Sequence, residues 1–594
     1  MADQLVLFLI LGATLTLFIW GPIRFDLVAV GALLTCAVLG LIAPADTFSG
    51  LGHPAVVTVA TVLIISQALQ NSGVIDLVAN RFASTTSSPI FFMTAISILG
   101  AVLSAFMNNV GALALLMPVA LHTCARSGFS PAMILMPLSF GTILGGLMTM
   151  MGTPPNIIIA SYRAETLGES FSVFDFSPVG IGAALAGIVF VSLVGWRLIP
   201  KHRSGSAGTE DLFELSDYIF EVQLREASPN LGENPLELET QFDQLDVVGL
   251  VRGRRRIMGD WHLRDLELQA GDVVVVQTDA QTLTKVMEEV GADLAAEQSV
   301  GEDDLNSEQV EVVEAVVTPS SSLVGRTYDG LRVRTRFSLA LLGISREGQA
   351  FKRRLTRVYL KAGDILLLQG ERTALGDSLS QLGCLPLARR DIRVSARPNA
   401  FWPVVVFAAA LAATSFGLVS VHIAFAVAIL VLIALKTISA SEAYGAIDWP
   451  VIILLAAMIP IGRALEITGG TDTITQGIMA ISQGVSPVVI LVLIMVVTMT
   501  LSDIMNNAAT AVVMAPIALN LARGLGVNPD AFLMAVAIGA SCAFLTPIGH
   551  QNNILVMGPA GYRFGDYWRL GLPLELIIIA VSTPLICVFW PLAG

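Results

Sequence analysis

The sequence predicts a polytopic α-helical membrane protein made of two inverted repeats, each with five transmembrane helices and one re-entrant hairpin, with a cytoplasmic α/β insert between them. Three observations predict this fold class. Of the 594 residues, 54% are hydrophobic and only 14% are charged, which is far from the composition of an average soluble protein. Most of the charged residues lie within 201–398, so two apolar blocks flank one soluble block. Short motifs also recur in both apolar blocks at a nearly constant offset, as expected of an internal repeat.

Apolar runs of about 17–25 residues are long enough to cross a bilayer as helices. The runs that we expect to cross are 4–20, 26–43, 54–72, 131–160, 177–199, 399–417, 420–437, 447–467, 530–560 and 572–592. Two further apolar stretches, 89–123 and 485–522, are split by Asn-Asn pairs, and we expect them to be re-entrant hairpins. An odd number of crossings in the first block inverts the second, and inverted repeats are typical of secondary transporters.

The predicted domains follow from these blocks. They are membrane repeat 1 (1–200), two small modules (210–297 and 308–389) and membrane repeat 2 (398–594). The first apolar run lacks a basic segment before it, so we interpret it as a membrane span and not as a cleaved signal. Basic residues favour an external N-terminus, which places Arg24, Arg126 and Lys436 inside. We therefore expect both termini outside, residues 201–398 in the cytoplasm, and a location in a bacterial inner membrane.

The internal repeat is clearest at two pairs of motifs. "SAFMNNVGALALLMP" (104–118) matches "SDIMNNAATAVVMAP" (502–516), and "TMMGTPPN" (149–156) matches "TPIGHQNN" (546–553). An Asn in hydrocarbon is costly unless it is hydrogen-bonded, and a lone one usually bonds a neighbouring helix. Two adjacent Asn residues cannot both face one neighbour, and nearby Pro or Gly residues favour a broken helix. Broken backbone at membrane depth is tolerated only where it lines a cavity, so we expect two hairpin tips and two broken helices to meet near the midplane.

Such a meeting point would suit an anion and a cation together, because helix N-termini and amide N–H groups favour an anion and hard oxygens favour a sodium-like cation. The predicted substrate-binding residues are Asn108, Asn109, Asn506, Asn507, Thr153, Pro154 and His550. The predicted sodium ligands are Ser104, Asn109 and Gly152 at one site and Ser502, Asn507 and Gly549 at the other. The candidates for coupling are Asp503, Thr149, Thr546, Asn156 and Asn553. Asp503 could instead cap the hairpin helix, and His550 could be a simple polar filler.

These motifs resemble those of the divalent anion/sodium symporter family of the ion transporter superfamily. That family carries Ser-Asn-Thr at each hairpin tip, a Pro nine residues after the Asn, and a T-P-P-N type break. Here "NNV" (108–110) and "NNA" (506–508) replace Ser-Asn-Thr and keep the nine-residue step to Pro118 and Pro516. "GTPPN" (152–156) matches, whereas "GHQNN" (549–553) departs from the pattern.

The resemblance covers both membrane blocks and implies sodium-driven uptake of a small divalent anion by an elevator motion of a homodimer in the lipid bilayer. Sulfate is the first substrate that we expect and a dicarboxylate the second. Asn-Asn tips also look similar to the arsenite-export and sodium/proton-exchange branches, so these functions stay open.

The insert repeats itself: "LQAGDVVVVQ" (268–277) matches "LKAGDILLLQ" (360–369). Strand patterns followed by helices at 280–290 and 372–382 predict one α/β module twice. The modules resemble paired RCK C-lobes, the ligand-sensing half of potassium-channel regulatory subunits, which implies regulation by a ligand of unknown identity. Because the insert contains no G-x-G-x-x-G motif, we predict no NAD.

Other function classes are disfavoured. The net charge of −13 argues against nucleic acid as a partner, and we find no catalytic constellation, so we do not expect an enzyme. An RCK-gated ion channel is a weaker alternative, because the sequence has no T-V-G-Y-G filter.

Overall fold

The computed structural model describes most of the chain. The described residues are 2–20, 23–72, 88–127, 129–199, 219–242, 245–253, 255–258, 263–264, 266–278, 280–294, 310–346, 349–351, 355, 358–371, 374–387, 401–470, 473 and 485–593. The predicted boundaries between the domains, near 200, 210, 297, 308, 389 and 398, lie outside these residues.

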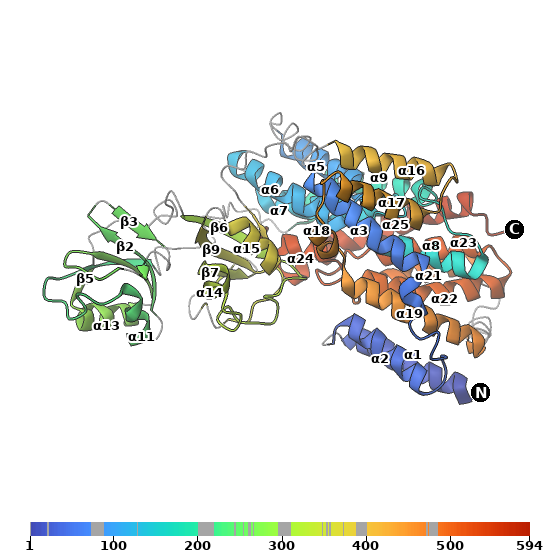
Figure 1. The fold of residues 1–594 in the computed structure, drawn as a ribbon. Coiled ribbons are helices and arrows are strands. Elements are labelled where there is room, and N and C mark those ends of the chain that lie inside the picture. Colours follow the sequence, from blue (N-terminus) through green and yellow to red (C-terminus); the bar gives the residue numbers. More distant parts are fainter. Residues whose placement is uncertain are drawn as a thin grey trace.

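Helices occupy one end of the molecule and two β-sheets the other (Figure 1). The helices before the sheets are α1 (Ala2–Trp20), α2 (Phe25–Val38), α3 (Pro54–Asn71), α5 (Pro89–Ser104), α6 (Asn109–Ser127), α7 (Pro131–Gly146), α8 (Pro154–Leu167) and α9 (Ser177–Leu193). The helices after them are α16 (Trp402–Ser415), α17 (Val421–Ala434), α18 (Ala440–Gly445), α19 (Trp449–Ile467), α21 (Pro487–Ser502), α22 (Asn507–Leu525), α23 (Pro529–Ser541), α24 (Gln551–Met557) and α25 (Tyr567–Phe589).

The two helical parts are interwoven. Helix α2 packs against α19, and α17, which holds the corresponding place in the second part, packs against α3. The last long helices of the two parts, α9 and α25, pack against each other. Within each part the first hairpin helix packs on the helix that follows the hairpin, α5 on α7 and α21 on α23. The chain therefore places equivalent segments of the two parts in equivalent surroundings.

The described helices are interrupted at all four predicted places, the two Asn-Asn pairs and the two long apolar runs. Helix α5 ends at Ser104 and α6 begins at Asn109, while α21 ends at Ser502 and α22 begins at Asn507. Residues 147–153 separate α7 from α8, and residues 542–550 separate α23 from α24. We call these two non-helical segments break 1 (147–153) and break 2 (542–550).

Some predicted spans differ from the helices at their ends. The run 26–43 is helical only to Val38, because Gly40 adopts a left-handed conformation with φ of 76° that ends the helix. Helix α25 begins at Tyr567, before the expected start of the run 572–592, since polar residues at its first turn hide the helix from a hydropathy count.

Few single helices are long enough to span a membrane alone. Among the described residues, Asn507–Leu525 and Phe564–Phe589 meet both the length and the hydropathy of a span. In the remaining apolar helices the apolar stretch is 10–17 residues long, for example Asp3–Phe18 within α1.

The insert contains two sheets of the same topology. Module 1 contains β1 (Ile219–Leu224), β2 (Asp246–Arg252), β3 (Arg255–Met258), β4 (Val273–Gln277), α13 (Ala280–Val290) and β5 (Ala292–Leu294). Module 2 contains β6 (Val310–Val317), α14 (Val333–Phe337), β7 (Leu339–Arg346), β8 (Gln349–Ala350), β9 (Ile365–Glu371), α15 (Leu375–Leu382) and β10 (Cys384–Pro386). The strand orders, β3-β2-β4-β1-β5 and β8-β7-β9-β6-β10, correspond one to one.

The repeated A-G-D segment forms the same turn in both modules. In module 1, Asp272 accepts a hydrogen bond from the backbone of Gln269 and pairs with Arg252. In module 2, Asp364 accepts from the backbone of Lys361 and pairs with Arg346 in the same way. The turn is thus fixed by its Asp and by an arginine at the end of a neighbouring strand.

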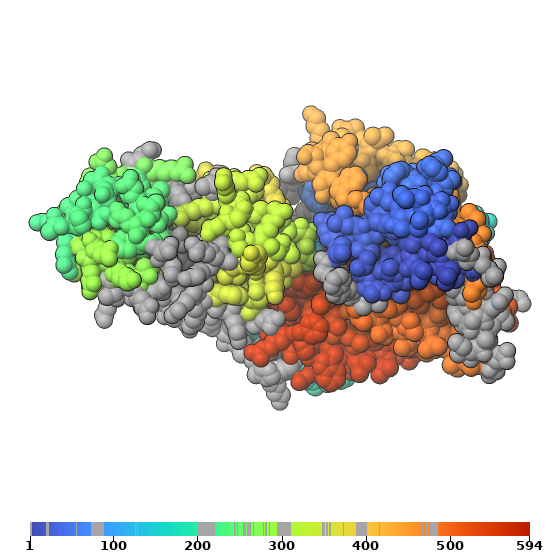
Figure 2. All heavy atoms as spheres, turned by 90° about the horizontal axis from the view of Figure 1, so that it is seen from below, coloured from blue at the N-terminus to red at the C-terminus, as the bar shows by residue number. Residues whose placement is uncertain are grey.

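The modules contact each other and the helices. Arg334 of α14 pairs with Glu239 of module 1, with 2.9 Å between Nη2 and Oε1. Seen from below, module 2 adjoins the C-terminal helices (Figure 2). Ile365 and Leu367 of module 2 belong to the large buried cluster of the helical part. Module 2 lies between module 1 and the helices (Figure 1), so module 2 is the part of the insert that packs on them.

Candidate functional site

A cavity of about 300 Å³ lies where the hairpin tips meet the two breaks. Its walls contain Asn108, Asn109, Thr153, Pro154, Asn506, Asn507, Gly549 and His550, together with Phe18, Ile23, Arg24, Phe25, Val110, Asp448, Val451, Ile504, Met505, Ala508, Ala509, Ile548 and Gln551. All seven predicted substrate-binding residues are in this group. The structure thus brings them together around one space.

A second cavity, of about 490 Å³, lies between α1, α8, α19 and α22. Its lining is mainly apolar, from residues such as Leu11, Leu15 and Leu455. Apart from a polar edge at His53, Glu165 and Arg463, it offers few groups that could bind ions. We therefore centre the candidate site on the smaller, more polar cavity.

The first Asn of each pair caps the hairpin helix that follows it. The Asn108 side chain accepts from the backbone N–H of Val110 at 3.0 Å, and the Asn506 side chain accepts from that of Ala508 at 2.9 Å. Asn is a preferred residue at this position because its side-chain oxygen satisfies a backbone donor that the helix leaves unpaired. The cap fixes where α6 and α22 begin and leaves the second Asn of each pair for other contacts.

The second Asn of each pair is held by the Ser that ends the preceding helix. Ser104 Oγ donates to Asn109 Oδ1 at 2.5 Å, and Ser502 Oγ lies 2.9 Å from Asn507 Oδ1. Ser502 Oγ also lies 2.6 Å from the carbonyl oxygen of Ala540. Ser104 and Ser502 are both fully buried. Each predicted sodium-ligand pair of Ser and Asn is therefore in direct contact.

Gly146 at the end of α7 and Gly152 of break 1 let backbone oxygens converge beside Asn109. A Cβ atom built on Gly152 would lie 2.6 Å from the carbonyl oxygen of Gly146 and 2.8 Å from that of Ser104. A Cβ on Gly146 would lie 2.5 Å from Asn109 Oδ1. A side chain at either glycine would fill this space, which is lined by hard oxygen atoms of the kind that sodium prefers.

In break 2, Gly549 occupies the corresponding position. A Cβ built on it would lie 2.9 Å from the carbonyl oxygen of Ser502. Unlike in break 1, the other close atoms are carbons, Ala543 Cβ and Asp503 Cα, each at 2.9 Å. The second predicted cation site is thus more apolar around its glycine than the first.

The Thr and Asn of the T-x-x-G-x-x-x-N motifs hold the breaks in place. In break 1, Asn156 Nδ2 donates to the carbonyl of Thr149 at 2.8 Å, and Thr149 Oγ1 donates to that of Ala105 at the hairpin tip. None of the four motif residues is in the cavity wall. The contacts favour a structural role for Thr149 and Asn156, both predicted as coupling candidates.

Break 2 uses the same bonds. Asn553 Nδ2 donates to the carbonyl of Thr546 at 3.2 Å, and Thr546 Oγ1 donates to that of Asp503 at 2.7 Å. Asn553 Oδ1 also accepts from Ser139 Oγ of α7 at 2.9 Å, a contact between the two helical parts.

His550 and Asn552 join break 2 to the first hairpin. His550 Nε2 lies 3.1 Å from Asn109 Nδ2, and Asn552 Nδ2 donates to the carbonyl of Asn109 at 3.0 Å and to Thr142 Oγ1 at 2.8 Å. His550 Nδ1 accepts from the backbone N–H of Asn552 at 3.1 Å. His550 thus both caps α24 and contacts the cavity wall.

Asp503 lies behind the second hairpin tip and is almost fully buried. Its Oδ1 accepts from the backbone N–H of Leu545 at 2.9 Å, and its Oδ2 has no hydrogen-bond partner among the described residues. Glu575 of α25 reaches the neighbouring N–H of Phe544 at 3.4 Å. Asp503 therefore ties break 2 to the hairpin tip and does not cap its own helix.

Besides Asp448 of the cavity wall, the sequence reasoning missed two charged residues near the site, Arg24 and Glu575. Arg24 is in the cavity wall with a side chain that is 66% exposed, and it pairs with Asp26, with 2.9 Å between Nη2 and Oδ2. Glu575 could have been noticed as the carboxylate inside the run 572–592. Neither has a counterpart in the other repeat, so the comparison of repeats could not find them.

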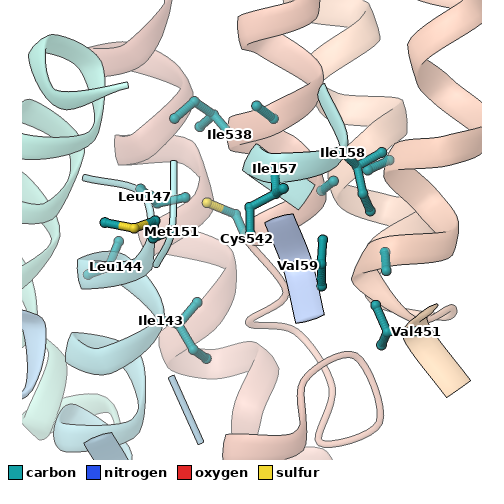
Figure 3. Close-up of a cluster of buried hydrophobic side chains, with 14 of the residues drawn as sticks. Val59, Ile143, Leu144, Leu147, Met151, Ile157, Ile158, Val451, Ile538 and Cys542 are labelled. Atoms are coloured by element: carbon teal, nitrogen blue, oxygen red, sulfur yellow. The ribbon is translucent and has the colours of Figure 1, made fainter. Parts of the chain in front are cut away.

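An apolar cluster lies beside the breaks. Figure 3 shows Cys542 of break 2 beside Ile157 of α8, and Met151 of break 1 beside Leu147, with Val59 and Ile538 nearby. These residues are nearly inaccessible to solvent. The non-helical backbone is thus buried in protein, as its polar groups require at membrane depth.

Comparisons with known proteins identify relatives of the whole chain. The profile of the family described as citrate transporters (CitMHS) matches residues 15–531 and 426–593. An uncharacterized transporter of Synechocystis is 30% identical over 583 residues, covering 96% of this chain and 93% of that protein. An uncharacterized transporter of Escherichia coli, YfbS, is 30% identical over 613 residues, covering 98% of each. Sodium/sulfate cotransporter 2 of Chlamydomonas reinhardtii is 22% identical over 761 residues, covering 94% of this chain and 86% of that protein.

Proposed function

The chain belongs to the citrate transporter family, and on this premise we propose that it is a sodium-coupled secondary active transporter that imports a small divalent anion, with sulfate as the first candidate. Family membership and the transporters among its relatives establish the coarser statement: the chain is an integral membrane transporter and not an enzyme. The substrate, the coupling ion and the mechanism are our proposals.

The observation that carries the proposal is the convergence of three helix N-termini on one cavity. Helices α6, α8 and α22 begin at Asn109, Pro154 and Asn507, all in the cavity wall. The N-terminus of a helix carries a partial positive charge, which favours an anion. Helix α8 contributes this charge without N–H donors at its first two positions, which are Pro154 and Pro155. Arg24 places a guanidinium group at the rim, where Asp26 pairs with it.

Sodium is proposed as the coupling ion on two grounds. Ser104, Asn109 and the oxygens beside Gly152 form one candidate sodium site, and Ser502, Asn507 and Gly549 form a second. Three relatives from Chlamydomonas reinhardtii are named as established or probable sodium/sulfate cotransporters. A bound cation next to a dianion would lower the cost of placing either charge at membrane depth.

The proposed mechanism is alternating access of the elevator type in a homodimer. The same order of helices before and after the insert supports a repeat. We propose that the two repeats are inverted, with both termini outside and residues 201–398 in the cytoplasm. In this arrangement the two hairpins would enter the membrane from opposite sides and meet at the cavity.

We further propose that the two modules of the insert are RCK C-lobe-like domains that regulate transport. Their shared strand order and their paired A-G-D turns support a duplicated α/β unit. We assign no NAD to them, and their ligand has still to be identified.

A dicarboxylate is the second candidate substrate. The cavity of about 300 Å³ is large enough for an anion bigger than sulfate, and the family takes its description from a carboxylate.

The test is uptake of labelled sulfate into proteoliposomes under an inward sodium gradient. We expect accumulation above the external concentration, and none when sodium is equal on both sides. A channel would not concentrate sulfate, and an exporter or a sodium/proton exchanger would not accumulate it under this gradient. Competition by unlabelled dicarboxylates, measured in the same vesicles, would rank the two candidate substrates.

A further inference from the structure

Module 2 touches the helical part at the A-G-D turn, where two glycines bring backbone against backbone. A Cβ atom built on Gly363 would lie 3.1 Å from the carbonyl oxygen of Ile554 and 3.8 Å from Met557 Cε. A Cβ built on Gly558 would collide with the carbonyl oxygen of Gly363 and lie 3.2 Å from Ile365 Cγ1. The turn thus sits directly on the C-terminal end of α24.

The fold of the module does not require this contact. Gly271 is the equivalent glycine of module 1 and has nearly the same backbone conformation, with φ of 84° against 88° for Gly363. No atom of the described residues lies within 4 Å of a Cβ built on Gly271. Within the described part of the chain, the turn of module 1 therefore has no neighbouring atom at its glycine, whereas the turn of module 2 lies against α24.

Alternate residues of β9 belong to different cores. Leu366 and Leu368 pack in the core of module 2, whereas Ile365 and Leu367 belong to the buried cluster that continues into the membrane helices. Figure 1 shows α24 beside module 2, and Figure 2 shows that module next to the C-terminal helices from another direction. The contact is therefore an apolar, buried one.

Helix α24 connects this contact, at its C-terminal end, with the cavity wall, at its N-terminal end. It has seven residues, Gln551–Met557, which is a rod of about 10 Å. Its first turn contains Asn552, which bonds the backbone of Asn109, and it is capped by His550 in the cavity wall. Ile554 is only two residues from Asn552. A displacement of α24 where it contacts module 2 therefore moves Asn552, which is within the same helical turn.

We propose that module 2 positions α24 and thereby sets the affinity of the cavity for its solute, so that a change in the insert reaches the transport site through this helix. The proposal rests on the proposed function, since it assumes that the cavity binds the transported anion. When the A-G-D turn of module 2 lies against α24, His550 and Asn552 are held against Asn109. When the turn moves away, break 2 becomes more mobile and the cavity residues are less well positioned to bind the anion. This is a coupling free energy between two sites that share one element.

The test compares Gly363→Ala with Gly271→Ala in the full-length protein. Both variants place a Cβ at a positive φ and carry a similar backbone strain, but only Gly363→Ala separates module 2 from α24. Hydrogen exchange of residues 545–557 should be faster in Gly363→Ala and unchanged in Gly271→Ala. In proteoliposomes the KM for sulfate should rise about 2- to 30-fold in Gly363→Ala alone, the range of known coupling mutations.

Equal exchange of residues 545–557 in both variants and in the wild type would overturn the proposal, as would faster exchange with an unchanged KM. If the wild type shows no sulfate uptake, the proposed substrate fails, and exchange of 545–557 alone decides whether module 2 positions α24. If Gly363→Ala does not fold, Gly558→Ala takes its place, because its Cβ would collide with the carbonyl oxygen of Gly363 from the α24 side of the same contact.

Discussion

Asn109 is the residue at which the most distant parts of the chain meet. Its side chain is held by Ser104 of the same hairpin and by His550 of break 2, and its carbonyl accepts from Asn552. A buried amide with this many partners is costly to disturb, because each partner left unpaired pays its own desolvation cost. Asn507 has the corresponding bond to Ser502 but no equivalent of His550, since Thr153 occupies that place in break 1.

We expect Asn109→Ala and Asn507→Ala each to reduce sodium-dependent sulfate uptake by about 10- to 100-fold, the loss of one hydrogen bond to a charged group. Initial rates in proteoliposomes measure this. Asn520→Ala is the matched control, because Asn520 is also a largely buried Asn of α22 but is not in the cavity wall. Normal transport by both site variants would show that the assignment is wrong.

The repeat in the sequence identified which residues surround the cavity but did not separate their roles. Thr149 and Asn156 recur as Thr546 and Asn553 as faithfully as the Asn pairs do, yet they bond the backbone of the breaks. A repeat preserves residues that shape the backbone as well as those that line the cavity. Arg24 and Glu575 each occur in only one of the two helical parts, so a comparison of the two parts does not identify them.

At the scale of elements, close helix packing supports the hairpins. A Cβ built on Gly141 of α7 would lie 2.8 Å from the carbonyl oxygen of Ser97 of α5, and one on Gly145 would collide with that of Ala101. In the second part, a Cβ on Gly539 of α23 would lie 3.1 Å from the carbonyl of Met495 of α21. Small residues let the backbones approach each other, which is how helices pack inside a membrane.

Gly145→Ala should lower the free energy of unfolding by about 1–3 kcal/mol, because the added methyl group forces α5 and α7 apart. Gly31→Ala in α2 is the control, since no atom of the described residues lies within 4 Å of its built Cβ. There the helix propensity of Ala should leave stability unchanged or slightly higher. Thermal unfolding of both variants in detergent measures the difference, and equal stability would contradict the packing described here.

The sequence predicted where the elements break better than where they end. Asn-Asn pairs and the Gly and Pro residues around them indicate a break by local chemistry alone, and the helices are interrupted at all four predicted places. The end of α2 depends on a single left-handed glycine, and α24 ends next to Gly558, which lies against Gly363 of module 2. Contacts between segments hundreds of residues apart cannot be predicted from the local sequence pattern.

For the whole molecule, the central claim is that both helical parts contribute to one pocket that holds sodium and the anion together. Neither part could form it alone, because the cavity wall takes residues from α6 and α8 of the first part and from α22 and break 2 of the second. Cation and anion bound side by side must each strengthen the binding of the other.

Equilibrium binding of labelled sulfate to the purified protein tests this most directly, in sodium chloride and in potassium chloride of equal concentration. We expect saturable binding in sodium, at least about tenfold weaker binding in potassium, and loss of the sodium effect in Asn109→Ala. Sulfate binding of the same affinity in both salts, or a sodium effect that persists without the Asn109 side chain, would contradict the account.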